Sequence, residues 1–335
     1  MLIDTSFGPL ESAAADAEAA EAEGYDGAFT GEVSNDPFLP LALAATSTER
    51  IDLGTSIAVA FARSPMSLAY TAYDLQRFTR GRLVLGLGSQ VKAHIIRRFS
   101  MPWGRPAPQM REFILALRAA WGSWSGGETL DFEGEYYRHT LMPPNFVPAA
   151  HPYGVPKVLL AGVGDAMTRV AGEVADGFLC HGFTTERWIR EHTVPALTEG
   201  RRRTGKSLDG FTVKAAVFLA TGSDEEMEAA AKGIRSHLAF YASTPSYRPV
   251  LDLHGWGELG TELTRLSKEG RWDEMGGLID DDVLNAFAIV APRDQVPELL
   301  ARRCAGVVDR VSFISTFPPT RQLLEAVRST RPAPR

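Results

Sequence analysis

The sequence has few cysteines, no long apolar run and no excess of positive charge, and each of these absences excludes a class of protein. Its 335 residues contain two cysteines, Cys180 and Cys304, too few for a disulfide framework or a cysteine metal site. The formal net charge of −6 argues against general binding to nucleic acids or anionic membranes. No apolar run approaches the roughly 18 residues that a membrane-spanning helix needs. We therefore expect a cytoplasmic protein that binds neither nucleic acid nor membrane.

Several catalytic motifs are missing as well. The seven histidines form no HxH pair and no HExxH motif, so we expect no metal site. There is no GxSxG nucleophile elbow. The stretch 200–207 (GRRRTGKS) matches the Walker A pattern, but a predicted helix precedes it and a predicted strand follows it. Because a phosphate-binding loop requires the opposite order, this match does not indicate a nucleotide site.

What the sequence does contain is a regular alternation of short apolar strands and amphipathic helices, which is typical of a parallel sheet. Eight strands and their spacing predict a single (β/α)₈ barrel domain over residues 1–335. Between strands seven and eight we expect a mostly helical insertion at 224–308, and we expect the tail 331–335 to be frayed. The predicted strands are Leu2–Asp4, Gly27–Thr30, Ile51–Ala58, Arg82–Leu87, Lys157–Ala161, Gly177–Cys180, Phe211–Leu219 and Arg310–Ser315.

Barrel enzymes carry their chemistry on the loops that follow the strands. Glu32 comes directly after the second strand, where a carboxylate can act as an acid, a base or a hydrogen-bond partner. The nearby Asn35 and Asp36 are explained equally well as turn and helix-capping residues. Glu32 is therefore a candidate catalytic residue.

The segment after the fourth strand combines small, polar and basic residues. Gly88 allows close backbone approach, while Ser89 and Gln90 offer hydrogen-bond donors at the end of the strand. A basic group follows in an otherwise acidic protein, and it suits a phosphate or polycarboxylate ligand, although an exposed helix face is the simpler alternative. The group consists of Lys92, His94, Arg97 and Arg98.

The fifth strand runs into two glycines and then a helix. Free backbone N–H groups and the helix dipole favour an anion at such a junction, so this is the best phosphate-binding candidate in the chain. The segment consists of Gly162, Val163, Gly164, Asp165, Ala166, Met167 and Thr168.

Four segments together resemble the luciferase-like monooxygenases, particularly their coenzyme F420-dependent branch. The resemblance implies a homodimer and a cofactor bound at the C-terminal ends of the strands. It covers most of the first 185 residues in order, and after residue 220 it rests mainly on fold. The segments are 53–65 (LGTSIAVAFARSP), 74–99 (DLQRFTRGRLVLGLGSQVKAHIIRRF), 102–121 (PWGRPAPQMREFILALRAAW) and 155–183 (VPKVLLAGVGDAMTRVAGEVADGFLCHGF).

The resemblance also implies roles by position. Ser56-Ile57 matches a bulge and a non-proline cis peptide behind the isoalloxazine ring of relatives. Gly88–Gln90 and Gly162–Met167 match the segments that hold the ribityl chain and phosphate. Two positions depart from the pattern, because several relatives place an Asp-His pair at Glu32-Val33 and a sugar-phosphate-oxidising relative has a glutamate at Gln90. Both departures argue against a sugar phosphate as substrate.

Three hypotheses follow. The first is hydride transfer between coenzyme F420 and a small organic substrate. The oligoglutamate tail of the cofactor would be attracted by basic side chains, with Lys92, Arg97, Arg98 and also Arg63 as candidates. The second is an FMN monooxygenase that a separate flavin reductase supplies with reduced flavin. The third is a non-catalytic flavin-binding protein. For a catalytic role the candidates are Glu32, Gln90 and His94.

Overall fold

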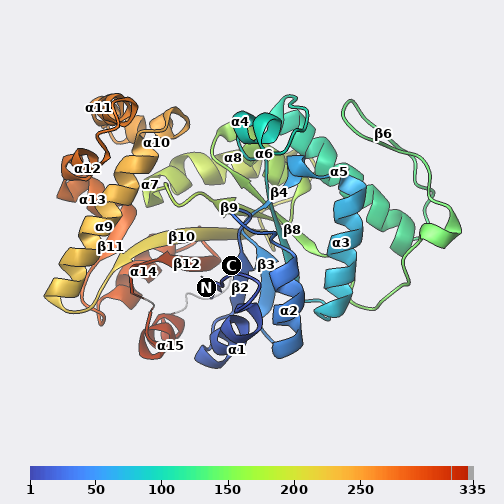
Figure 1. Cartoon of the computed structure of the whole chain (residues 1–335), viewed down its shortest axis with the longest axis horizontal. Coiled ribbons are helices and arrows are strands. Elements are labelled where there is room, and N and C mark those ends of the chain that lie inside the picture. The colour runs from blue at the N-terminus through green and yellow to red at the C-terminus, as the bar shows by residue number, and fades with distance from the viewer. Residues whose placement is uncertain (318, 331–335) are drawn as a thin grey trace.

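Within residues 1–317 and 319–330, which the computed structural model describes, eight parallel strands close into a barrel (Figure 1). The predicted fold class is therefore confirmed. The tail 331–335, which we expected to be frayed, lies outside the described residues. The barrel strands, in spatial order, are β1 (Leu2–Ser6), β2 (Gly27–Thr30), β3 (Asp52–Thr55), β5 (Leu83–Gly88), β8 (Lys157–Gly162), β9 (Gly177–Cys180), β10 (Thr212–Ala220) and β12 (Arg310–Ile314), which pairs with β1.

Helices surround this barrel and extend it on one side. Those between the barrel strands and at the end of the chain are α1 (Ala13–Glu23), α2 (Leu39–Ser47), α3 (Pro65–Phe78), α4 (Lys92–Arg97), α5 (Pro106–Ser125), α6 (Asp165–Val174), α7 (Glu186–Trp188), α8 (Val194–Arg202) and α15 (Arg321–Ser329). A π-helical segment, η3 (Ile189–Thr193), joins α7 to α8. None of the helices in the described ranges is both long and apolar enough to span a membrane.

The third strand is interrupted, where the sequence predicted one continuous strand from Ile51 to Ala58. β3 ends at Thr55, and β4 (Ala58–Val59) resumes pairing with β5 after the peptide bond between Ser56 and Ile57. That bond is cis, as the resemblance implied.

β3 and β5 approach each other too closely for a side chain at Gly86. A Cβ there would lie 1.9 Å from the carbonyl oxygen of Thr55. The Thr55 hydroxyl donates to the Gly86 carbonyl at 2.6 Å and accepts from the Gly86 N–H at 2.9 Å. A threonine side chain therefore replaces ladder hydrogen bonds at the point where β3 stops.

The insertion between β10 and β12 forms a second core beside the barrel, visible as the yellow to orange helices of Figure 1. Its elements are α9 (Asp224–Ala242), η4 (Pro245–Tyr247), α10 (Arg248–Leu253), α11 (Gly257–Lys268), α12 (Trp272–Met275), η5 (Gly276–Leu278), α13 (Asp281–Phe287), β11 (Ala288–Val290) and α14 (Val296–Cys304). The predicted helical character is correct, but β11 was missed. It extends the sheet by pairing with Phe218–Ala220, beyond the point where β9 ends.

The apolar face of α5 is not free for association. Met110, Phe113 and Trp121 are buried against the rest of the subunit, and the Trp121 indole donates to the Ala69 carbonyl of α3 at 3.1 Å. The apolar side chains of α5 therefore belong to the core of one chain and offer no face for a dimer. A small hairpin, β6 (Phe132–Glu133) with β7 (Arg138–His139), follows α5.

Charged side chains fill the N-terminal half of the barrel. The Asp4 carboxylate lies 2.6 Å from the Lys214 ammonium and 2.7 Å from the Arg310 guanidinium, and all three side chains are at most 7% exposed. Arg310 also pairs with Asp52 at 2.6 Å. Burial raises the pKa of Asp4, but attraction by Lys214 and Arg310 outweighs it, so that the pKa lies below its ordinary value.

Asp4→Asn is expected to destabilise the fold by about 3–5 kcal/mol, because it leaves two buried cations without their shared carboxylate. Urea unfolding at several pH values measures this. Since the folded pKa of Asp4 is lowered, its contribution is present at neutral pH and is lost as the pH falls, and the variant should flatten that dependence. Asp52→Asn is the control, because Asp52 pairs with the same arginine but is 33% exposed. Equal losses in both variants would contradict this reasoning.

Candidate functional site

The C-terminal mouth of the barrel has a floor of small residues. Side chains at alternate positions of a strand face the same side, and Phe29, Val84, Leu159 and Leu179 pack together inside the barrel. The next inward-facing positions toward the mouth are therefore Gly31, Gly86, Ala161 and His181. Three of these four residues have at most one side-chain carbon, so the mouth has room for a flat ligand.

The interruption of the third strand lies at this floor. The Ile57 side chain packs toward β5, where a Cβ on Gly88 would lie 2.9 Å from the Ile57 Cδ1 atom. Ser56-Ile57 and Gly88 are thus brought together, as predicted. The neighbouring Gln90 has a positive φ of 58°, and its side-chain oxygen accepts the Val91 N–H at 2.9 Å. The Ser89 hydroxyl donates to the Gln90 carbonyl at 3.0 Å.

Glu32 lies at the mouth, and its carboxylate is already engaged. It accepts two hydrogen bonds from Arg63, at 2.6 and 3.0 Å, and one from the Val59 N–H at 2.7 Å. The Glu32 side chain is 8% exposed. A carboxylate held by three donors fixes the loop after β2 against the end of β4, which is a positioning contact.

The basic residues of α4 lie on its surface. Lys92, His94, Arg97 and Arg98 are exposed, and none of them forms an ion pair among the residues that the structure describes. Arg98 donates to the Val33 carbonyl beside Glu32, and its guanidinium stacks over Phe99 at 4.9 Å. Figure 1 shows α4 at the same end of the molecule as α10. The group therefore adds unneutralised positive charge at the edge of the mouth.

The predicted phosphate-binding segment forms the turn between β8 and α6. Gly164 caps α6 without a side-chain hydrogen bond, so no side chain occupies the first N–H groups of this helix. A Cβ on Gly164 would meet nothing within 4 Å, whereas a Cβ on Gly162 would lie 3.0 Å from Met167. Gly162 is thus required by packing, and Gly164 leaves space. The Thr168 hydroxyl turns back to the Gly164 carbonyl at 3.1 Å.

A cavity of about 520 Å³ opens next to this turn. It lies between the N-terminus of α6, the helix after β9 and α10 of the insertion, and its lining includes Val163, Gly164, Asp165, Trp188, Val250 and Leu253. The shape and the uncapped helix suit the phosphate of a flavin-type cofactor, although the Asp165 carboxylate in the first turn reduces the positive potential there.

A group of aromatic and titratable residues beside this turn, at the end of the adjacent strand β9, was not predicted. The His181 ring stacks on Tyr247 with centroids 4.5 Å apart, and its Nε2 atom lies 3.0 Å from the Tyr247 hydroxyl. Tyr241 contacts both rings, and His237 contacts Tyr241. Because His181 follows β9 whereas the other three belong to the insertion, only the fold brings them together. The aromatic content of 240–256 was the available signal.

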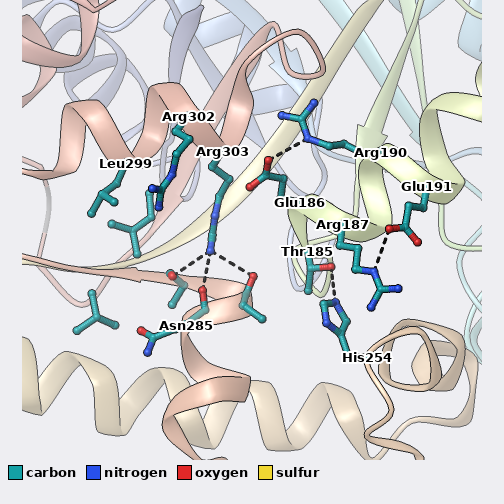
Figure 2. A pocket seen from close by; sticks show the side chains of 14 residues that line it. Thr185, Glu186, Arg187, Arg190, Glu191, His254, Asn285, Leu299, Arg302 and Arg303 are labelled. Carbon is teal, nitrogen blue, oxygen red and sulfur yellow. Dashed lines mark hydrogen bonds and ion pairs between the residues drawn. The ribbon is translucent and has the colours of Figure 1, made fainter.

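A separate groove of about 580 Å³ lies on the outer surface, and its arginines are largely engaged within the protein (Figure 2). Arg187 and Arg190 pair with Glu191 and Glu186, each at 2.9 Å. Arg303 donates to the carbonyls of residues 285–288 at 2.8–3.2 Å, so it caps the C-terminus of α13. These contacts identify the groove as a structural junction between α7 and the insertion.

Comparison with known proteins gives one family. The luciferase-like monooxygenase model matches residues 3–310. An uncharacterised protein of Mycobacterium tuberculosis is 54% identical over 303 residues, which cover 90% of this chain and 89% of that protein. Another M. tuberculosis protein, provisionally named a coenzyme F420-dependent oxidoreductase, is 29% identical over 328 residues, which cover 92% of each chain.

Solved structures with a similar fold include a coenzyme F420-dependent enzyme. The solved structure of coenzyme F420-dependent tetrahydromethanopterin reductase from Methanopyrus kandleri superposes with a TM-score of 0.76 at 22% identity. The match covers 97% of this chain and 96% of that chain. Similarity at this identity establishes the shared fold.

Glu32→Gln is expected to destabilise the protein by about 1.5–3 kcal/mol, because it weakens charge-assisted hydrogen bonds to a half-buried arginine. Denaturant unfolding measures the loss. Glu191→Gln is the matched control, since the Glu191–Arg187 pair is about half exposed and should contribute at most about 1 kcal/mol. A Glu32→Gln variant as stable as the control would show that this contact does not hold the mouth in place.

Proposed function

Since this chain belongs to the luciferase-like monooxygenase family, we propose that it is an oxidoreductase that transfers a hydride between coenzyme F420 and a small organic substrate. The observation that carries the choice of cofactor is the unpaired basic group on α4 at the edge of the mouth. A cofactor with only one phosphate leaves these charges without a partner, whereas an oligoglutamate tail provides several carboxylates. The provisional name of the 29% identical relative supports the same cofactor.

The residues of the mouth would then hold the parts of the cofactor in order. The N-terminus of α6, with Gly162–Thr168, would bind the phosphate, and Gly88–Gln90 would support the ribityl chain. Ser56 and Ile57 would lie behind the ring, and Lys92 and Arg98 would face the tail. When bound, the deazaflavin supplies or accepts the hydride, while the protein orients it and excludes water.

We also propose a two-fold homodimer. With the α5 face buried, the contact must use other apolar side chains, and α2 offers Leu39 and Leu43, which are 58% and 41% exposed. Sedimentation at micromolar concentration should give the mass of two chains. Leu39→Glu should shift the equilibrium toward monomer, whereas Leu141→Glu, at an exposed position outside α2, should not. Monomer alone in the unaltered protein would contradict the proposal.

Parallel titration of the purified protein with F420 and FMN tests the cofactor. Lys92→Ala or Arg98→Ala should weaken F420 binding a few-fold and FMN binding less, because exposed charge pairs contribute about 0.2–1 kcal/mol each. The difference should shrink as salt rises. Lys268→Ala, which removes an exposed lysine from α11, is the control and should change neither affinity.

The alternatives give distinct results. Equal losses for both cofactors would show that the α4 charges do not recognise the tail. Tight FMN binding without F420 binding would indicate a monooxygenase that needs a flavin reductase. Binding of either cofactor with no turnover of any substrate would indicate a flavin-binding protein.

A further inference from the structure

We propose that Tyr247 is the proton donor of this reaction, that His181 positions it, and that the substrate is a ketone or secondary alcohol with an apolar ring. This inference rests on the proposed function. It assigns a catalytic residue and a substrate class to the side of the mouth that the insertion covers.

Hydrogen bonds fix the tautomer of His181. Its Nδ1 atom accepts the Phe183 backbone N–H at 3.0 Å, so Nδ1 carries no proton. A neutral imidazole then carries its proton on Nε2, which lies 3.0 Å from the Tyr247 hydroxyl oxygen. His181 is therefore the donor in this contact, and the oxygen of Tyr247 is the acceptor.

This direction leaves the hydroxyl proton of Tyr247 available. Among the described residues, His181 is the hydrogen-bond partner found for the Tyr247 hydroxyl. A phenol that accepts from an imidazole can still donate its own proton to a third group. The pair thus retains one O–H donor whose oxygen is fixed in position.

The position of the pair is at the mouth. His181 is the inward-facing residue of β9 above Leu179, and it lines a small cavity together with Gly162 and Val163 of the predicted cofactor site. The next residue, Gly182, lies close to the end of β12, because a Cβ on Gly182 would be 3.0 Å from the Ile314 side chain. Tyr247 comes from η4, which leads into α10 at the edge of the 520 Å³ cavity.

The surroundings keep both groups neutral. Burial, and to a smaller extent His237, lower the pKa of His181 to about 4. Burial, and to a smaller extent Tyr241, raise the pKa of Tyr247 to about 12. The titratable groups that face the pair are thus His237 and Tyr241, and neither is an acid that would protonate His181. Tyr247 keeps its proton at neutral pH and remains a stronger acid than an alcohol.

The other candidates at the mouth are less suited to this role. The Glu32 carboxylate is occupied by Arg63 and the Val59 N–H. His94 is exposed on α4, outside the barrel, and the amide of Gln90 releases no proton at neutral pH.

The step balances as follows. A reduced deazaflavin gives a hydride to the carbonyl carbon and is oxidised by two electrons. The electron pair of the C=O π bond moves to the oxygen, which takes the proton of Tyr247 as its O–H bond breaks. The products are an alcohol and a tyrosinate that recovers a proton from water. Alcohol oxidation would need the tyrosinate as its base, so ketone reduction is the direction expected at neutral pH, and oxidation should rise with pH.

The substrate class follows from the wall around this donor. His181, Tyr241 and Tyr247 form a half-buried aromatic surface, and Phe183 packs behind it. Aromatic rings bind flat apolar bodies, and they offer no fixed cation for a phosphate. A cyclic or aryl ketone, or the corresponding alcohol, fits this wall better than a sugar phosphate.

The test uses the full chain with reduced F420 and three carbonyl compounds, cyclohexanone, acetophenone and 6-phosphogluconolactone, and follows the oxidation of the cofactor by its absorbance. The first two should react and the sugar phosphate lactone should not. Tyr247→Phe should lower kcat about 10²–10⁴-fold while the Kd for F420 stays within two-fold. Tyr136→Phe, which removes a phenol of the distant β6–β7 hairpin, should leave kcat unchanged. His181→Gln should give a smaller loss in kcat than Tyr247→Phe.

A second measurement needs no turnover. In ¹⁵N-labelled protein without cofactor, the His181 resonances should report a proton on Nε2, and Tyr247→Phe should shift that signal. A proton on Nδ1 would overturn the proposed positioning.

The remaining outcomes are distinguishable. Failure of the protein to bind F420 would contradict the proposed function as an F420-dependent oxidoreductase. If F420 binds, unchanged kcat in Tyr247→Phe would exclude the proton donor, and a loss confined to F420 affinity would make Tyr247 a cofactor ligand. F420 binding without reduction of the two ring ketones, or with preference for the sugar phosphate lactone, would exclude the substrate class.

Discussion

The Asp4 carboxylate is the interaction on which the barrel depends, because it neutralises two cations that the fold has taken out of water. Lys214 and Arg310 come from β10 and β12, and Asp4 comes from β1. These strands form the seam where the end of the chain meets its beginning. A buried charge is tolerated only when it is paired, so the seam closes in the one register that brings these groups together. The ring of Phe29 covers the cluster, with the Lys214 ammonium 4.2 Å from its centroid.

Because this ion cluster lies in the N-terminal half of the barrel, the two halves of the barrel differ in the side chains that fill them. The N-terminal half holds large and charged side chains. Above Phe29 and Val84, the inward positions change to glycine and alanine, and the backbone of β3 turns away after Thr55. Glycine and alanine therefore keep the side-chain volume low in this part of the barrel. The positive charge near the C-terminal ends of the strands comes from two elements outside the barrel, the basic helix α4 and the N-terminus of α6.

The sequence was sufficient for the fold class. Strand periodicity predicted all eight barrel strands, and the family resemblance implied the cis peptide at Ser56-Ile57. Contacts between distant segments could not be predicted. β11 has only three residues, too short for a periodic signal. The burial of α5 depends on the segments that pack against it, which its own sequence does not reveal. The ion pair of Glu32 could not be predicted because its partner, Arg63, lies 31 residues away in the sequence.

The same limitation explains why the His181–Tyr247 pair was missed, and it indicates how the chain divides its tasks. Residues before 181 follow the family pattern, whereas the residues that cover β9 and β10 come from the insertion. A cofactor is common to many relatives, so its site can be inferred from shared segments. A substrate differs between relatives, so we expect the residues that contact it to lie outside the four segments that carry the resemblance. The insertion fits that expectation, because it places three aromatic side chains, His237, Tyr241 and Tyr247, around the one inward-facing histidine of the mouth.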